Sequence, residues 1–358
     1  MTAELLETHS SSRPGKVPLY EASTQFKSWR YSPERLRDVR QTLNAGAVAA
    51  IRKTLETDEP GSSTSVSFLQ PDDELLLVKL YITKIPQLCG HFRFPEEVEA
   101  TAISYLKRFY LKNTVMDWHP KNVMLTALFL ATKTTNNPIS LDSYTSNIPK
   151  TSQSDVLDLE FLVAQSLNFE FAVWHAHRAL WGLWLDLQSL PNLTESLRPM
   201  EVYETALKHV RTSRFTDAEL IYAPSQIAFA ALSLVSPFLC QKWLDSKVPP
   251  DPTAAQSSLQ VLEQTNSAIG NMIMQQGQPP DVEAARQVDR RLKLCKNPEK
   301  VVGSKAYLTR RAEEERRAEE KRSKKAQDMR KISEGEDPFG SQLVGRQESP
   351  SVNDDDDD

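Results

Sequence analysis

Residues 98–134, VEATAISYLKRFYLKNTVMDWHPKNVMLTALFLATKT, decide the fold of this chain. In the second half of this stretch only Thr126 is polar between Val123 and Ala131, so a helix there must be enclosed by other helices. Pro120 suits the first turn of that helix, where a missing N–H costs nothing. The first half predicts an amphipathic helix, because its apolar side chains recur at helical spacing: Val98, Ala102, Tyr105, Leu106, Phe109 and Tyr110. The apolar run is shorter than the roughly 20 residues that a membrane span requires.

The enclosed helix has a second copy further along the chain. Pro120 is followed by KNVMLTALFLA, and Pro224 is followed by SQIAFAALSLV, an offset of 224 − 120 = 104 residues. An aromatic residue precedes each proline by two positions, Trp118 in the first copy and Tyr222 in the second. Self-similarity at a fixed offset indicates a repeated structural unit. The sequence therefore predicts two helical domains, each built around one enclosed helix.

Composition supports an all-α fold. The chain of 358 residues has only 11 Gly, few for a fold with many tight turns, and alternating strand patterns are scarce. Hydrophobic residues make up 39% of the chain, which indicates that part of it lies outside any core. Cys89, Cys240 and Cys295 are far apart and no secretory signal opens the chain, so we expect a reducing compartment and no disulfides.

The charge distribution argues against a nucleic-acid-binding core. The net charge is −5, and the middle of the chain, residues 72–275, holds 16 Lys plus Arg against 21 Asp plus Glu. A duplex-binding surface is normally basic, because neutralising phosphates supplies much of the affinity. We therefore expect no direct contact with nucleic acid and none with a membrane.

Composition shifts and proline-marked loops divide the chain into six predicted segments. They are a disordered N-terminus that includes the start of an N-terminal segment (1–31), an N-terminal helix (32–56), a first repeat (72–171), a second repeat (172–276), a charged C-terminal helix or arm (281–331) and a disordered acidic tail (332–358).

Each repeat is predicted to contain five helices. In the first they are an apolar run over 75–85 capped by Asp72, then 96–113, 120–133, a short helix around Tyr144 and a longer one capped by Ser154 or Asp155. In the second they cover 174–188, 199–212, 224–236, 239–246 and 255–275.

Several stretches in this order resemble one family. YLKRFYLKNTVMDWHPKNVMLTALFLATK and LEFLVAQSLNFEF resemble the cyclin fold. YEASTQFKSWRYSPERL and SRFTDAELIYAPSQIA are similar to the opening helix and the second box of the cyclin H branch, and the resemblance covers about residues 19–300. It implies an all-α protein with two tandem five-helix cyclin boxes flanked by N- and C-terminal helices.

The same resemblance implies a regulatory, non-catalytic role without a cofactor. The implied partners are the catalytic subunit of a cyclin-dependent kinase (CDK) that activates other such kinases, a RING-finger assembly factor and the core of the transcription and nucleotide excision repair factor TFIIH. The implied substrates are the carboxy-terminal domain of RNA polymerase II and other CDKs, and the implied location is the nucleus. Cyclins act by shifting the kinase toward its competent state.

Two residues match the polar pair through which cyclins hold their kinase. The resemblance implies this role for Lys133, at the end of the enclosed helix, and for Glu160, in LEFL. A lysine only donates hydrogen bonds and a carboxylate only accepts them, so the pair could hold a partner's backbone. Without the resemblance, the simpler reading is two solvated surface charges.

The chain departs from cell-cycle cyclins at three places. Lys107 stands where those cyclins have Asp, and Thr134 and Thr135 stand where they have acidic residues after the lysine. The substrate-docking pattern Met-Arg-x-x-Leu is absent from residues 75–85, so we do not expect substrates to be recruited through it.

Other functions and sites were weighed against this one. His175 and His177 are two residues apart, a spacing that does not direct both toward one metal ion on a helix, and His119 is expected in a loop. No metal-binding or phosphate-loop motif is present. A DNA-bound general initiation factor with two cyclin folds is the main alternative, although the zinc ribbon and basic second repeat typical of such factors are missing. A scaffold without a kinase partner is a third.

The C-terminal region carries two kinds of short motif. Lys321, Arg322, Lys324 and Lys325 form a possible nuclear-import run, or simply one charged face of a helix. Ser349 and Ser351 resemble kinase phosphorylation sites, where added charge would tune partners rather than the fold.

Overall fold

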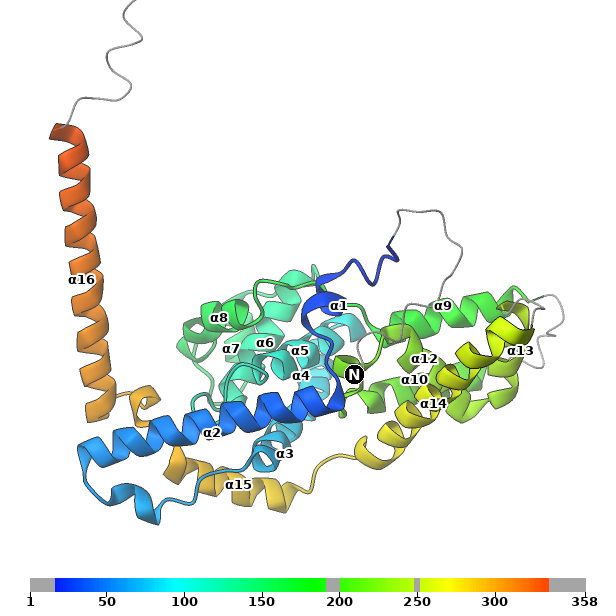
Figure 1. Ribbon diagram of the computed structural model, residues 1–358, viewed down its shortest axis with the longest axis horizontal. Coiled ribbons are helices and arrows are strands. Elements are labelled where there is room, and N and C mark those ends of the chain that lie inside the picture. The colour runs from blue at the N-terminus through cyan, green and yellow to red at the C-terminus, as the bar shows by residue number, and fades with distance from the viewer. Residues whose placement is uncertain (1–16, 191–199, 248–251, 335–358) are drawn as a thin grey trace, which may run out of the picture. The chain divides into compact units, whose positions relative to one another are not determined.

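The computed structural model describes residues 17–190, 200–247 and 252–334, and within these ranges all regular structure is helical (Figure 1). This confirms the predicted all-α class. The chain divides into two compact units, Met1–Asn297 and Pro298–Asp358. Ser349, Ser351 and the acidic tail beyond residue 334 lie outside the described residues.

The first repeat is built around α6 (Pro120–Thr134). Every residue of α6 from Val123 to Thr132 is buried, which confirms the enclosed helix. The imidazole of His119, the residue before α6, accepts a hydrogen bond from the N–H of Lys121 and so caps the helix at its start. The helices that complete the repeat are α3 (Pro71–Ile82), α4 (Lys84–Phe92), α5 (Glu96–Phe109), α7 (Leu141–Ser146) and α8 (Ser154–Ser166), of which α3, α5 and α8 pack directly on α6.

The second repeat is built in the same way around α12 (Pro224–Val235). All residues from Ile227 to Leu232 are buried. The other helices of this repeat are α9 (Ala176–Gln188), α10 (Met200–Ser213), α11 (Ala218–Ile221), α13 (Pro237–Lys247) and α14 (Pro252–Gln276), and α9, α10, α13 and α14 pack on α12. The predicted duplication is therefore present in three dimensions.

The first predicted helix is in fact two helices. The apolar run over 75–85 is interrupted after Ile82, where α3 ends, and α4 begins at Lys84. Pro86 explains the interruption, because it has no N–H to donate to the carbonyl of Ile82. The predicted cap at Asp72 is also wrong, since α3 already begins at Pro71, with the carboxylate of Asp73 accepting from the N–H of Gln70 at 2.9 Å.

Two further boundaries differ from the prediction. The helix predicted over 96–113 ends at Phe109, and the amide of Asn113 folds back to donate to the Phe109 carbonyl at 3.0 Å. Neither Ser154 nor Asp155 is the N-cap of α8, which is Gln153. Asp155 instead accepts from the N–H of Ser152 at 2.8 Å, so its carboxylate still satisfies a backbone donor near the helix start.

The N-terminal segment is more ordered than predicted. Within the segment 1–31, which was predicted to be mostly disordered, α1 covers Thr24–Ser28 and Trp29 is 1% exposed. The N-terminal helix, α2 (Pro33–Asp58), begins after Ser32, whose hydroxyl accepts from the N–H of Arg35 at 3.2 Å. A short 3-10 helix, Ser62–Ser65, follows α2.

The segment predicted as a charged C-terminal helix or arm over 281–331 belongs to both units. In the first unit, α15 (Val282–Cys295) packs on α3 and buries Val288, Leu292 and Cys295 in the core of the first repeat. In the second unit, a 3-10 turn (Pro298–Lys300) precedes α16 (Lys305–Glu334), a charged helix with i,i+4 ion pairs such as Arg310–Glu314 at 2.9 Å.

The three cysteines are free and buried. None of the described helices is long and apolar enough to span a membrane.

Candidate functional site: a polar pair among exposed apolar side chains

The packing of α6 on α8 brings Lys133 and Glu160 together. Lys133 lies one residue before the end of α6 and Glu160 lies in the middle of α8. The Lys133 Nζ is 2.5 Å from the Glu160 Oε1, and the two side chains are 43% and 25% exposed. The predicted pair thus forms one accessible site on the surface of the first repeat.

The position of Lys133 is fixed by its surroundings. Its ammonium lies 4.5 Å from the centroid of the Phe129 ring, which is a favourable cation–π contact. α6 ends at Thr134, one residue after Lys133, and Asn136 two residues further on adopts a left-handed conformation with φ 58°. A cation near a helix C-terminus is also stabilised by the helix dipole.

Exposed apolar side chains surround Glu160 on the outer face of α8. Leu157 and Phe161, which are four residues apart and so share a face, stand on either side of Glu160 in the sequence and are 45% and 69% exposed. The opposite face of α8 buries Val156 and Val163 completely. Because the inner stripe already supplies the core contacts, Leu157 and Phe161 are available to a partner. We did not predict these residues, although an aromatic residue outside the buried stripe was a visible signal.

The turn after α8 adds a third exposed apolar residue to this surface. Asn168 and Phe169 both have positive φ, 55° and 57°, a conformation that bulky residues rarely adopt. The N–H of Phe169 donates to the carbonyl of Ala164 at 2.9 Å, which holds the turn. The Phe169 ring is 54% exposed and lies 6.1 Å from the ring of Phe161, centroid to centroid.

Thr134, one of the three departures from cell-cycle cyclins, has an internal role. The Tyr105 hydroxyl lies 3.0 Å from the Thr134 Oγ1 and donates to the carbonyl of Phe171 at 2.7 Å. Tyr105 thereby contacts both the end of α6, beside Lys133, and the segment that follows Phe169. One buried side chain thus helps to position both Lys133 and Phe169.

Lys107, another departure, joins the two repeats. It is 8% exposed, its ammonium lies 2.8 Å from a carboxylate oxygen of Glu219, and it donates to the carbonyl of Thr216 at 2.7 Å. A buried lysine requires such partners. The second repeat supplies both of them, so the lysine is compatible with the fold.

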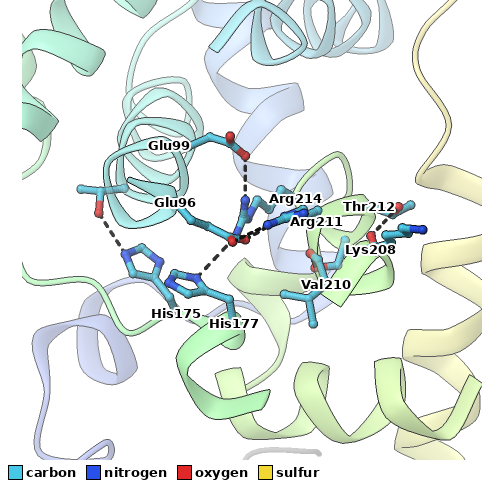
Figure 2. A network of polar contacts seen from close by, with 11 residues as sticks. Glu96, Glu99, His175, His177, Lys208, Val210, Arg211, Thr212 and Arg214 are labelled. Carbon is cyan, nitrogen blue, oxygen red and sulfur yellow. Dashed lines mark hydrogen bonds and ion pairs between the residues drawn. The ribbon is translucent and has the colours of Figure 1, made fainter. Parts of the chain in front are cut away.

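A larger charged network joins α5 to α10 (Figure 2). The Arg214 guanidinium, 8% exposed, donates to Glu96 at 2.6 Å and to Glu99 at 2.7 Å. Arg211 also donates to Glu96, at 2.7 Å. Burial alone would raise the pKa of Glu96, but the hydrogen bonds and charges of the two arginines outweigh it and lower this pKa to about 2.

His175 and His177 belong to the same network and stack on each other, with ring centroids 5.2 Å apart. The His175 Nε2 is 2.9 Å from the hydroxyl oxygen of Thr101. Burial, followed by the neighbouring positive charges, lowers the pKa of His175 well below its usual value and that of His177 to about 4. Both rings are therefore neutral at pH 7. No cluster of three metal-binding side chains occurs among the described residues.

The possible nuclear-import run is accessible. Lys321, Arg322, Lys324 and Lys325 are all exposed on α16. Whether an import receptor reads them stays a prediction.

Comparison with known proteins agrees with this architecture. Residues 51–172 match the family model of the cyclin N-terminal domain, and residues 175–274 match that of the cyclin C-terminal domain. Together they cover more than half of the chain, with a boundary between the two repeats.

Relatives and solved structures point the same way. A putative cyclin-H of Dictyostelium discoideum is 37% identical over 221 residues, which cover 60% of this chain and 75% of the relative. A chain in the CAK complex of Chaetomium thermophilum bound to ATP-gamma-S has a TM-score of 0.71 and 25% identity, with 91% of this chain and 98% of that chain covered. A chain in the yeast TFIIK (Kin28/Ccl1/Tfb3) complex has a TM-score of 0.58 and 29% identity, with coverages of 71% and 100%. The chain therefore belongs to the cyclin family, and within it to the cyclin H branch.

Proposed function

We propose that this chain is the regulatory subunit of a cyclin-dependent kinase and has no catalytic activity of its own. The observation that carries the proposal is the Lys133–Glu160 pair, accessible on α6 and α8 and bordered by exposed Leu157, Phe161 and Phe169. The similar chains of known structure were solved within the CAK and TFIIK complexes.

This surface can hold a kinase in a way that tolerates variation in the partner's sequence. Lys133 has donors left after binding Glu160, and Glu160 has lone pairs left, so the two can bind carbonyl and N–H groups of a partner backbone. The exposed Phe161 and Phe169 rings would supply most of the affinity as apolar anchors. Bound to the kinase helix whose glutamate pairs with the ATP-positioning lysine, the surface would favour the active conformation.

The finer assignments follow from the same comparison. The yeast complex contains Kin28 and Tfb3 beside its cyclin. By analogy, we propose a RING-finger assembly factor and the TFIIH core as further partners. The proposed substrates are the polymerase carboxy-terminal domain and other CDKs, and the proposed location is the nucleus.

Reconstitution tests this function directly. The full chain is co-expressed with the catalytic kinase subunit from the same cells, and phosphorylation of a peptide with repeats of the polymerase carboxy-terminal domain is measured. We expect the kinase to co-purify with the chain and its activity to rise at least about tenfold over the kinase alone, which corresponds to about 1.4 kcal/mol of preference for the active state. Equal kinase activity with and without the chain would contradict the proposal and favour the alternative that the chain is a scaffold.

The DNA-binding alternative is not favoured, and a separate experiment tests it. A gel-shift titration of the purified chain with duplex DNA at about 150 mM salt should show no specific complex, since the boxes are not basic. A salt-dependent complex that prefers one sequence would favour an initiation factor instead.

A further inference from the structure

An apolar cavity lies between α2, α3 and the second repeat, and none of its lining residues belongs to the proposed kinase-binding surface. Its volume is about 350 Å³, and residues of α2, α3, the end of α5 and the segment 215–217 between α10 and α11 line it. None of the lining residues belongs to α6 or α8. The apolar side chains that form its walls are Leu43, Leu75, Val78, Ile82, Leu111 and Phe215.

The cavity opens into a wider hollow of about 710 Å³. Arg40, Pro71, Leu75, Asp217 and Gln276 line both, so the two spaces adjoin, and we treat them as one groove between α2, α3 and the end of α14. A compact small molecule that filled the cavity would leave the wider part empty. The shape suits an elongated ligand with one bulky apolar group.

The cationic side chains along the groove differ in whether a carboxylate pairs with them. Arg40 donates to both carboxylate oxygens of Asp217, each at 2.7 Å, and Lys107 is paired with Glu219. Lys79 has no such partner among the described residues. Its ammonium donates to the backbone carbonyl of Gln276, which leaves donors available at the cavity.

Two carboxylates line the cavity, those of Asp217 and Glu74, and both are already engaged. Glu74 accepts from the side-chain amide of Asn44 at 2.6 Å and from the N–H of Val115 at 2.8 Å. Burial is the largest influence on the pKa of Glu74 and raises it, while the hydrogen bonds from Asn44 and Val115 lower it. Both oxygens of Glu74 are thus satisfied within the chain, and Lys79 keeps donors for an incoming acidic group.

The wider part of the groove presents side-chain amides. Gln41, Gln70 and Gln276 line it and are exposed. An amide side chain both donates and accepts hydrogen bonds, as the N–H and C=O groups of an extended peptide do. A peptide backbone can satisfy the hydrogen bonds of these amides. A lipid or another apolar chain cannot, and would leave them without hydrogen-bond partners.

We propose that this groove binds an extended peptide segment of a partner protein, with one large apolar side chain in the 350 Å³ cavity and an adjacent acidic residue on Lys79. The three glutamines would hold the peptide backbone in the wider part of the groove. Such a site would let the regulatory subunit recruit proteins through a surface separate from the one that holds the kinase.

A positional peptide library tests the proposal on the full-length chain. Eight-residue peptides, each with one position fixed as one amino acid, are scored for binding by fluorescence anisotropy. We expect selection for Leu, Ile or Phe at one position and for Asp or Glu within two residues of it. For the best peptide, Lys79→Glu should weaken binding at least tenfold and shift the preference from acidic to basic residues. The matched control Lys84→Glu makes the same charge change at an exposed residue outside the groove and should leave binding unchanged.

A second variant tests the cavity itself. Leu75→Trp fills the space next to the apolar walls and should abolish selection for the apolar residue, while kinase binding and the thermal midpoint show that the chain is folded. The proposal is overturned if the library yields no preference, or if selected peptides bind both variants as well as the unmodified chain. A third result would also overturn the proposal. If no peptide is selected but octanoate binds saturably and this binding depends on Lys79, the groove binds a small carboxylate instead. Each of these results is independent of whether Lys133 and Glu160 bind a kinase.

Discussion

At the residue scale, the contacts between the repeats make the chain sensitive to acid. His177 has a pKa of about 4 because it is buried and lies beside Arg214, whose guanidinium nitrogen is 3.4 Å from its Nδ1. Arg178 and Arg211 lower this pKa further, and Glu96 opposes them. In the unfolded chain the imidazole has its ordinary pKa of about 6.5. Between these two values the unfolded state binds a proton that the folded state does not.

We therefore predict that the free energy of unfolding falls as the pH is lowered from about 6.5 to about 4. The stabilising contribution of neutral His177 is complete above pH 6.5 and is lost across this window. His177→Gln should reduce the slope of stability against pH in this range, because Gln can still accept from Arg214 but does not titrate. Thermal midpoints at pH 7, 5.5 and 4.5 measure the effect.

His91→Gln is the control, since it removes an exposed histidine on α4, outside the network. The same slope in His177→Gln and in the unmodified chain would refute the role of His177. Glu96, with a pKa of about 2, adds a separate loss only between about pH 4.5 and about pH 2, where the unfolded chain binds a proton at this carboxylate and the folded chain does not.

Residue by residue, the candidate site was only partly predictable from the sequence. Lys133 and Glu160 could be named only through the resemblance of the stretches that contain them to cyclins, because on their own they read as two solvated surface charges. Phe161 was missed although it lies outside the buried stripe of its helix, and Phe169 could not be found, because a sequence does not distinguish an aromatic residue in a core from one displayed to a partner. Phe169 in addition depends on two left-handed residues in a row, and no glycine marks that turn.

At the scale of elements, α1 and α2 are anchored to the first repeat by Trp29. Its indole N–H donates to a Glu170 oxygen at 2.6 Å, and the Arg108 guanidinium lies 5.0 Å from its ring centroid. Leu36 of α2 and Leu111 after α5 belong to the same apolar cluster. These partners come from distant parts of the sequence, so the anchoring role of Trp29 could not be predicted from the sequence.

Trp29→Ala should lower the free energy of unfolding by about 3–5 kcal/mol, the usual cost of removing a large buried aromatic side chain. Urea denaturation measures this loss. Leu19→Ala, at a residue that is 79% exposed, is the control and should change stability by less than about 0.5 kcal/mol. A Trp29→Ala chain as stable as this control would show that α1 does not hold the N-terminal segment in place.

Long apolar helices were the elements best predicted from the sequence. The limits of α6 and α12 agree with prediction to within one residue, because a proline starts each and an apolar run fills it. Errors arose where a single residue overrides the apolar pattern, as Pro86 does between α3 and α4. The pattern of hydrophobicity alone could not show that interruption.

At the scale of the whole molecule, the duplication and the regulatory class were visible in the sequence, but the contacts between the repeats were not. Arg214 and Glu96 are 118 residues apart, and Ser104 and Glu219 are 115 apart. Charged residues at such separations carry no periodic signal. The groove that holds Lys79 is formed in the same way, by residues of α2, α3 and the second repeat, so it too became visible only in three dimensions.

The central claim, that Lys133 and Glu160 hold a kinase, is tested most directly by exchanging the two residues. The double variant Lys133→Glu, Glu160→Lys keeps an ion pair between α6 and α8 and the net charge of the chain. Its stability should therefore change by less than about 1 kcal/mol, as expected for an exposed pair. The control exchanges two exposed residues on α10 of the second repeat, Glu204→Lys with Lys208→Glu.

The measurement is the Kd of each purified chain for the catalytic kinase subunit, beside its thermal midpoint. We predict that the exchange at positions 133 and 160 weakens binding at least tenfold, about 1.4 kcal/mol. Carbonyl groups of the kinase backbone would then face a carboxylate, and its N–H groups would face an ammonium. The control exchange should leave the Kd unchanged. The account is contradicted if the chain with residues 133 and 160 exchanged has the same Kd and the same thermal midpoint as the unmodified chain.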